Sequence, residues 1–183
     1  MEAIIISGLP AVGKTETAKQ LSAALHIKDV NGGDILKEMA RERGYMPSGE
    51  GWWDSSDGIR FLKEREGDPQ FDKEVDRRML ALIEKGDVVV ASWTMPWLSK
   101  HGFKVWLDAS TDVRAHRMSM RDGTSVEICR KVIEERDRLN YELYEKLYGI
   151  KLGKDKKPFD VIINTDNLAV SQVADAIMQK MRD

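Results

Sequence analysis

Short apolar runs alternate along the chain with longer segments in which apolar positions recur every three to four residues. The runs at 3–7, 27–30, 88–92, 104–108 and 161–164 have the length of strands, and two of the last three contain continuous apolar stretches, as in strands buried on both faces. Helical periodicity follows the first two runs, at 14–25 and 34–43. This alternation predicts an α/β fold with a five-stranded parallel sheet and helices on both faces.

Two segments interrupt the alternation. The first, 44–70, is rich in glycine, tryptophan and aspartate, and its large apolar side chains would be costly to leave in water. These side chains are Trp52, Trp53, Phe61 and Leu62. We therefore expect an inserted flap with some helix, within a single domain that spans 1–183. The second interruption is the lysine-rich segment 149–158.

Charge and composition narrow the possible partners. The 29 basic and 31 acidic side chains give a net charge of −2, which argues against binding to a nucleic-acid polymer. Cys129 is the one cysteine, so neither an intramolecular disulfide nor a cysteine-based zinc cage can form, and a reducing compartment is expected. No window approaches the roughly 18 apolar residues of a membrane span. We expect a cytoplasmic protein that does not bind a membrane.

The segment GLPAVGKT at 8–15 carries the strongest chemical signal. It matches the phosphate-binding pattern G-x-x-x-x-G-K-[ST] and lies between a predicted strand and a predicted helix. Glycine at both ends lets the loop turn backbone N–H groups toward phosphate oxygens. We expect Lys14 to bridge the β- and γ-phosphates of ATP and Thr15 to reach a magnesium ion. The predicted nucleotide-binding residues are Gly8, Ala11, Val12, Gly13, Lys14, Thr15 and Glu16.

The remaining acidic residues favour a kinase over a nucleotide switch. The strand at 88–92 ends without the aspartate with which switch proteins hold magnesium, and no guanine-reading N-K-x-D sequence is present. Asp34 follows the second strand, where its carboxylate can face the metal or the acceptor. Alternatively, Asp34 caps the helix that begins there.

Arginines late in the chain predict a lid, at about 117–138. Arg114, Arg117 and Arg121 share one face of a helix, and Gly123 lies in the loop that follows. Arg136 falls on the apolar stripe of the next helix, which we expect to face inward, where an arginine needs an anion. The stripe consists of Ile128, Val132, Leu139, Leu143 and Leu147. Closure of such a lid would exclude water while Arg117, Arg121 and Arg136 clamp the transferring phosphoryl group. The alternative is a solvated, charged hairpin.

Candidate acceptor-binding residues lie between the loop and the lid. Lys37 and Arg41 are spaced i, i+4 on the second helix and would hold an acceptor phosphate. Asp72 and Asp76 have the same spacing, beside Arg77 and Arg78; together they could read a base edge and a phosphate, or pair on a solvated surface. Trp93 and Trp97 either stack on a nucleobase or cover the core.

Taken in order, these motifs resemble the nucleoside monophosphate kinases, and most closely the small archaeal-type cytidylate kinases. The resemblance covers most of the chain and rests on 8–15, 32–35, 68–69, 71–78, the lid arginines, 135–136, 148–150 and 159–165. It implies a P-loop kinase fold with an acceptor-binding flap after the second strand and an arginine-bearing lid. The implied reaction is transfer of the γ-phosphoryl group of ATP, with Mg²⁺, to CMP or dCMP.

Three departures from the family pattern lie on the acceptor side. Lys37 stands where the family usually has an arginine, the stretch 91–97 lacks the usual Glu-Gly-Arg, and 44–70 is longer than the usual connection. A kinase for another small acceptor, either a different nucleotide or a metabolite, therefore remains open. So does a regulatory module that binds ATP without transferring its phosphate. We expect a monomer or a homodimer.

Overall fold

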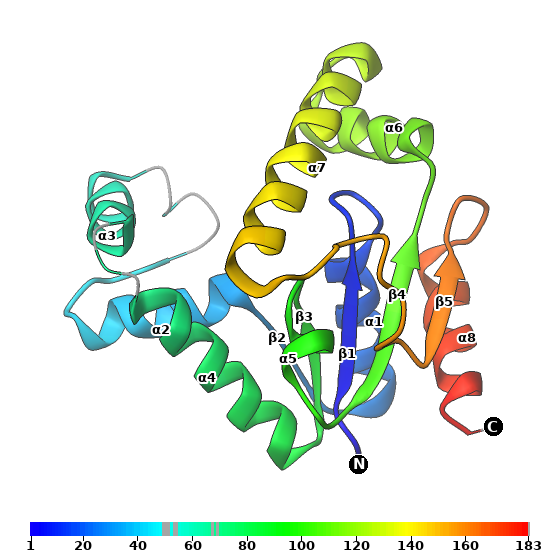
Figure 1. The fold of residues 1–183 in the computed structure, drawn as a ribbon, viewed down its shortest axis with the longest axis horizontal. Helices are drawn as coiled ribbons and strands as arrows, with labels where there is room; N and C mark the ends of the chain where they lie inside the picture. Colours follow the sequence, from blue (N-terminus) through cyan, green and yellow to red (C-terminus); the bar gives the residue numbers. More distant parts are fainter. Residues whose placement is uncertain (49–51, 53–54, 67, 69, 183) are drawn as a thin grey trace.

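The computed structural model describes residues 1–48, 52, 55–66, 68 and 70–182. Five parallel strands form a sheet in the order β2-β3-β1-β4-β5 (Figure 1). They are β1 Ile4–Gly8, β2 Lys28–Asn31, β3 Val88–Ala91, β4 Phe103–Asp108 and β5 Val161–Asn164. Every strand end lies within one residue of the run identified in the sequence, so the predicted five-stranded parallel sheet is confirmed.

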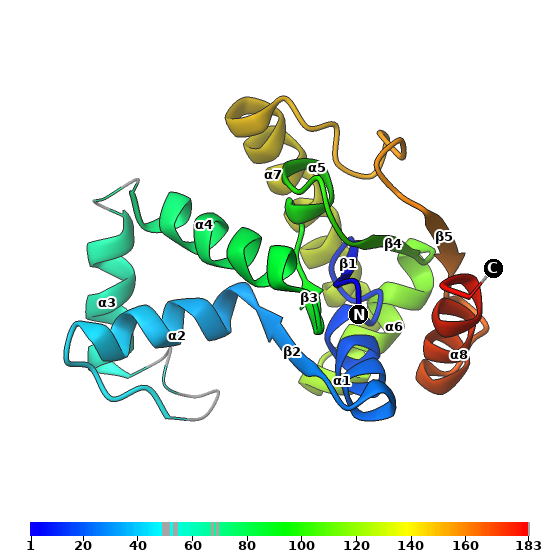
Figure 2. The ribbon, with the colours of Figure 1, turned by 90° about the horizontal axis from the view of Figure 1, so that it is seen from below.

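Strand β1 runs through the middle of the sheet, and its side chains alternate between two cores. Ile4 and Ile6 pack on one face with α1 and α8, whereas Ile5 packs on the other face with α4 and α5. The bounds of these helices are α1 Lys14–Leu25, α4 Gln70–Lys85, α5 Met95–Leu98 and α8 Val170–Lys180. Figures 1 and 2 show these helices on both sides of the sheet. The carboxyl ends of the strands share one edge, where open α/β sheets bind their ligands.

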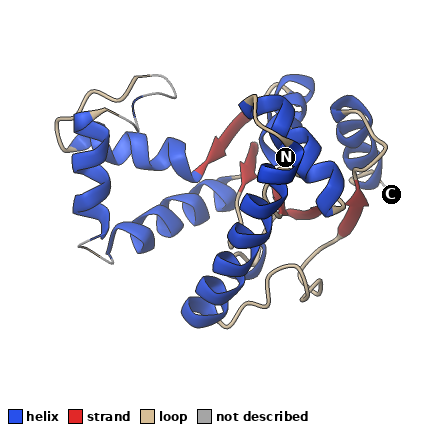
Figure 3. Ribbon diagram, turned by 90° about the horizontal axis from the view of Figure 1, so that it is seen from above, coloured by secondary structure: helices blue, strands red, loops and turns tan. Residues whose placement is uncertain are grey.

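Helices α2 Gly32–Glu42, α3 Ser56–Glu66 and α4 form an arm that projects from the sheet (Figure 3). Its interior is aromatic, because the Phe61 ring lies 5.6 Å from Tyr45, 5.8 Å from Trp52 and 5.5 Å from Phe71. Trp52 and Phe61 are buried. The described part of the segment expected to form a flap is therefore packed and contains a helix; Trp53 lies outside the described residues.

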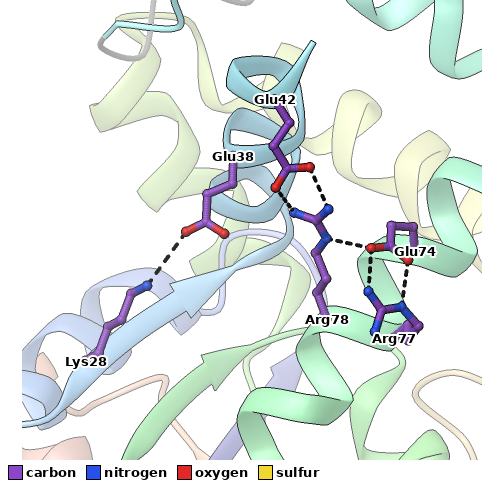
Figure 4. A network of polar contacts seen from close by, with 6 residues as sticks. All are labelled: Lys28, Glu38, Glu42, Glu74, Arg77 and Arg78. Atoms are coloured by element: carbon purple, nitrogen blue, oxygen red, sulfur yellow. Dashed lines mark hydrogen bonds and ion pairs between the residues drawn. The ribbon is translucent and has the colours of Figure 1, made fainter.

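Ion pairs join the parts of the arm to one another (Figure 4). Arg78 of α4 donates to both carboxylate oxygens of Glu42 in α2, at 2.6 and 2.7 Å, and to Glu74 at 2.7 Å. Arg77 also donates to Glu74, and the hydrogen bonds from the two arginines hold the pKa of Glu74 at about 2. Lys28 pairs with Glu38 at 3.8 Å and links β2 to α2. Arg78 thus joins α4 to α2, whereas the ion pair of Arg77 lies within α4.

Helices α6 Thr111–Asp122 and α7 Val126–Tyr148 form the hairpin that the sequence indicated as a lid. Gly123, with a φ of 65°, ends α6, and the Ser125 side chain caps α7 by accepting from the Ile128 N–H at 3.3 Å. No helix in the described part of the chain is long and apolar enough to cross a membrane.

The buried face of α7 differs from the expected apolar stripe. Cys129 and Ile133 pack against α6, and Asp137, four residues after Ile133 on the same face of the helix, is buried as well. The expected stripe is 43 to 56% exposed, and Arg136 is exposed as well. The prediction of an inward-facing Arg136 is therefore wrong in this conformation. Asp137 turns inward because it pairs with Arg114, and hydropathy patterns do not register a buried ion pair.

Candidate active site

The phosphate-binding loop connects the carboxyl end of β1 to the start of α1. Gly8 has a φ of 153°, and a Cβ atom there would lie 2.4 Å from the Leu107 carbonyl oxygen, so only glycine fits. Gly13 has a φ of 101° just before α1. Ala11 has a φ of 63°, a strained conformation of the kind that gathers at ligand-binding loops. The loop leads directly to the free N–H groups at the first turn of α1, which attract anions.

Lys14 folds back onto this loop. Its Nζ atom donates to the carbonyl oxygens of Gly8 at 2.8 Å and Leu9 at 2.9 Å, and lies 5.4 Å from the centre of the Trp93 ring. Burial, together with the positive charges of Arg136 and Arg114, lowers the pKa of Lys14 to about 7. The phosphates of a bound nucleotide would place negative charge next to this ammonium group and stabilise its charged form.

A cleft of about 780 Å³ opens beside the loop, between the arm and α7. It brings together most of the site residues identified in the sequence. These are Lys14, Thr15, Glu16, Asp34, Lys37, Asp72, Asp76, Trp93 and Arg121. They come from α1, α2, α4, the connection after β3, and α6. Residues that are far apart in the sequence therefore share one concave surface.

A second cavity, of about 420 Å³, adjoins the same loop. Ala11, Val12 and Gly13 line it, together with Arg117 and Thr165. Lys14, Thr15, Glu16 and Arg121 line both cavities. The two cavities therefore meet at the start of α1, where a group could pass from a ligand in one to a ligand in the other. Gly8 lies beneath the loop and lines neither cavity.

The three arginines expected to act as a clamp occupy different positions. Arg117 is half-buried and donates to the Thr165 carbonyl and hydroxyl oxygens, at 2.6 and 2.9 Å, and to the Val12 carbonyl oxygen at 3.4 Å. Arg121 lies where the cavities meet and pairs with Asp122 at 2.6 Å. Arg136 lines neither cavity, although its charge acts on Lys14.

Arg114 lies next to the loop and was not among the site residues identified in the sequence. It is buried, pairs with Asp137 at 2.7 Å, and donates to the Pro10 carbonyl oxygen at 3.4 Å. Its Nε atom is buried and has no hydrogen-bond partner among the residues that the structure describes. The sequence does place opposite charges at Arg114 and Asp137 on two successive helices. Many other charged residues on these helices could pair in the same way, so the sequence alone does not single out this pair.

Asp34 occupies the capping position considered for it. The Asn31 side chain accepts from the N–H groups of Gly33 and Asp34, and the Asp34 carboxylate accepts from the Asn31 N–H at 2.9 Å. This reciprocal arrangement is a capping box at the start of α2. Asp34 also lines the cleft, so its carboxylate stabilises α2 and is in reach of a ligand at the same time.

The two aspartates of α4 face the cleft from the arm, as their spacing predicted. Tyr148, the last residue of α7, donates a hydrogen bond of 2.8 Å from its hydroxyl to Asp76. Burial raises the pKa of Asp76; the hydrogen bond from Tyr148 opposes this rise, and the charge of Asp72 adds to it. Tyr144 and Tyr148 line the cleft but were not among the site residues identified in the sequence, although Tyr148 lies in the segment 148–150 on which the family resemblance partly rests.

Arg41 and Trp97 also lie outside the cleft, whereas Trp93 is within it. Arg41 is exposed near the end of α2, so Lys37 alone of that pair lines the cleft. Trp97 donates its indole N–H to Asp155 at 3.2 Å and lies edge-on to Phe159, which makes it a cover over the core. Trp93 lines the cleft.

Comparison with solved structures places the fold among known ones. A shikimate kinase from Acinetobacter baumannii aligns with a TM-score of 0.61 and 15% identity, over 100% of this chain and 93% of that chain. A gluconokinase from Sinorhizobium meliloti aligns with a TM-score of 0.55 and 12% identity, over 98% and 91%. At these identities the likeness shows the fold alone, which is that of the P-loop kinases.

Comparison of sequences is more specific. The chain is 36% identical over 163 residues to a cytidylate kinase from Pyrococcus horikoshii, covering 88% of this chain and 79% of the relative. It is 32% identical over 173 residues to a cytidylate kinase from Pyrobaculum arsenaticum, covering 93% and 88%. Residues 3–167 match the model of the Cytidylate kinase-like family. By the extent of both matches, this chain belongs to the Cytidylate kinase-like family.

Proposed function

We propose that this protein transfers the γ-phosphoryl group of ATP to CMP or dCMP. The observation that carries the proposal is that Lys14, Thr15 and Arg121 line both cavities at the place where the cavities meet. One cavity would hold the nucleotide donor and the other the acceptor, with the transferring group between them. Relatives named cytidylate kinase support CMP as the acceptor.

Phosphoryl transfer depends mainly on positioning and charge neutralisation, so no nucleophilic side chain is required. The loop amides and Lys14 would hold the β- and γ-phosphates, and Lys14 would exchange its contacts with the Gly8 and Leu9 carbonyls for phosphate oxygens. Arg121 would neutralise charge on the group in transfer. Arg117 would keep the donor cavity in shape through Thr165 and Val12.

The acceptor would lie in the larger cleft. Lys37 supplies a positive charge there for the acceptor phosphate, although a lysine offers one charged point where an arginine offers a planar fork. The carboxylates of Asp72 and Asp76 would face the base. Arg136 would join the clamp when the lid closes, since its charge already acts on Lys14.

A magnesium ion is also part of the proposal. The Thr15 hydroxyl and the Asp34 carboxylate both line the cleft beside Lys14 and are hard oxygen donors of the kind that Mg²⁺ prefers, so these residues fit the ion. Mg²⁺ would neutralise phosphate charge during transfer. Thr15 would hold the ion directly, and Asp34 would do so through its water shell while it continues to cap α2.

The test is a coupled assay of ADP release with ATP, magnesium and each common nucleoside monophosphate in turn. We expect CMP and dCMP to accelerate ADP release far above the slow release without acceptor. The Lys14→Ala variant should lose at least about 100-fold in turnover. Lys85→Ala is the matched control, because Lys85 is exposed at the far end of α4.

Each other outcome has a defined meaning. Near-normal turnover of Lys14→Ala would disprove the donor site. If a metabolite accelerates ADP release and no nucleoside monophosphate does, the proposed acceptor is wrong, but the proposed ATP site is retained. ATP binding without acceptor dependence and without a nucleotide product would instead indicate the regulatory module.

A further inference from the structure

The hydroxyl of Tyr148 forms the hydrogen bond that joins α7 to the aspartates of the arm. The 2.8 Å contact with Asp76 links residues 72 positions apart, at a point where both side chains line the cleft. Tyr148 is 37% exposed, so its ring forms part of the cleft surface. The bond fixes the direction of a carboxylate that faces a ligand site.

The Tyr148 ring continues along α7 into an aromatic wall, made of Trp93, Tyr144 and Tyr148. The rings of Tyr144 and Tyr148 are stacked, with centroids 6.4 Å apart and an interplanar angle of 20°. The Tyr144 ring lies 5.6 Å from that of Trp93, which in turn lies over the Lys14 ammonium. All three rings line the cleft. A wall of this kind gives a flat base a face to stack on, beside the loop that holds phosphate.

A carboxylate beside such a wall distinguishes bases by their exocyclic groups. A carboxylate accepts hydrogen bonds, so it pairs with the amino group of cytosine and opposes the carbonyl oxygen that uracil has at the same ring position. A site built to bond one group rejects the analogue that lacks it, because the buried polar atom is left unpaired. Asp76 is half-buried, and this burial raises the pKa of its carboxyl, so part of this penalty applies to its carboxylate.

We propose that the aromatic wall and Asp76 form the seat of the acceptor base, and that Tyr148 is a positioning residue which aims the Asp76 carboxylate at the exocyclic amino group of a pyrimidine. This inference rests on the proposed function and names the part of the cleft that selects the base. Tyr148 does not touch the reacting phosphates in this arrangement. Its loss therefore affects selection between acceptors and leaves the use of ATP unchanged.

The test compares CMP with UMP as acceptors for the wild type, Tyr148→Phe and Asp76→Asn. Tyr148→Phe keeps the ring and removes only the hydroxyl, so we expect KM for CMP to rise about tenfold and the CMP preference, as the ratio of kcat/KM values, to fall by a similar factor. Asp76→Asn places an amide donor beside the base, and the CMP preference should fall by about 100-fold or more. KM for ATP should stay within about twofold in both variants.

Tyr141→Phe is the matched control. Tyr141 lies on the same helix, packs against the core that contains Ile4 and Ile6, and does not line the cleft. We expect Tyr141→Phe to preserve the CMP preference. If removal of any tyrosine hydroxyl from α7 lowered this preference, Tyr141→Phe and Tyr148→Phe would both show the effect. Thermal unfolding of each variant checks that the fold is retained.

Binding without ATP separates this inference from the proposed function. Quenching of tryptophan fluorescence by CMP and by UMP, with Trp93→Phe to identify the reporting ring, measures affinity without turnover. Tyr148→Phe or Asp76→Asn variants that weaken CMP and UMP equally would overturn the seat while the kinase activity stands. A wild type that binds CMP, loses binding in Asp76→Asn and transfers nothing would support the seat and overturn the kinase. Absence of CMP binding would overturn both.

Discussion

Arg114 and Asp137 form an ion pair between the two helices of the lid, with N–O distances of 3.1 and 2.7 Å, and both side chains are buried. Arg114 also donates to the Pro10 carbonyl oxygen of the phosphate-binding loop. The pair therefore ties the lid hairpin to the loop as well as to itself. A buried pair contributes little compared with apolar side chains of the same shape, but removal of one partner leaves the other charge buried and alone.

We expect Arg114→Met to lower the free energy of unfolding by about 3–5 kcal/mol, measured by urea denaturation. The double variant Arg114→Met with Asp137→Leu should recover much of this loss, since no charge then remains buried. Arg138→Met is the control, because Arg138 makes its ion pairs with Glu135 and Glu142 at the exposed surface and should contribute far less. Equal losses for Arg114→Met and Arg138→Met would contradict a structural role for the buried pair.

Arg121 is the lid arginine placed to act on the transferring group. Since it lines both cavities, Arg121→Ala should lower kcat by about 100- to 1000-fold, with smaller changes in KM for either substrate. Arg130→Ala is a suitable control, because Arg130 pairs with Asp112 and lines neither cavity. Steady-state kinetics of ADP release decide the point. A kcat for Arg121→Ala as high as that of Arg130→Ala would remove Arg121 from the clamp.

Arg117 should behave differently from Arg121. It bonds to Thr165 and Val12 in the wall of the smaller cavity. We expect Arg117→Ala to raise KM for ATP about tenfold, because the wall loses hydrogen bonds that hold it in place, while kcat falls much less. A loss confined to kcat, with KM for ATP unchanged, would return Arg117 to the phosphate clamp that the sequence suggested.

Lys14 gives the stability of the nucleotide-free protein a defined pH dependence. Its pKa falls from 10.5 to about 7 on folding, so between these values the unfolded chain holds more protons on this residue than the native chain. The free energy of unfolding therefore rises with pH across this window, and the cost of burying the charge is complete below pH 7.

Comparison with Lys14→Met isolates this effect from all other titrating groups. From pH 7 to pH 10, we expect the stability of the wild type to rise relative to the variant by on the order of 3–4 kcal/mol. Urea denaturation without nucleotide, in half-unit steps of pH, measures the difference. Parallel stability curves would show that the Lys14 ammonium is as well solvated in the native protein as in the unfolded chain.

The sheet and the phosphate-binding loop were predictable because their signals are local. A buried parallel strand is an apolar run, and the loop requires glycine at positions 8 and 13, where the backbone adopts positive φ values. Asp72 and Asp76 were also placed correctly on one face, since helical spacing alone determines that relationship.

The lid and the cleft wall depend on contacts between distant residues, which a single sequence does not encode in any local pattern. The spacing of apolar residues predicted that Arg136 faces inward. In the structure a different face of α7 is buried, the one that carries Asp137, because Asp137 pairs with Arg114. Tyr148 meets Asp76 only because α7 is long enough to reach the arm. Trp93 was named from the sequence as a residue that could stack on a base, whereas the two tyrosines of the aromatic wall, Tyr144 and Tyr148, were missed for the same reason.

The length of α7 has a mechanical consequence. Its 23 residues make a rod of about 34 Å, with Arg136 near the midpoint and Tyr148 at one tip. If the rod stays straight, a tilt of about 10° around the midpoint moves each tip by about 3 Å in opposite directions. One end of α7, at Tyr148, touches the arm, and the other end, at Val126, joins α6. A ligand that displaces Tyr148 therefore also shifts the lid hairpin.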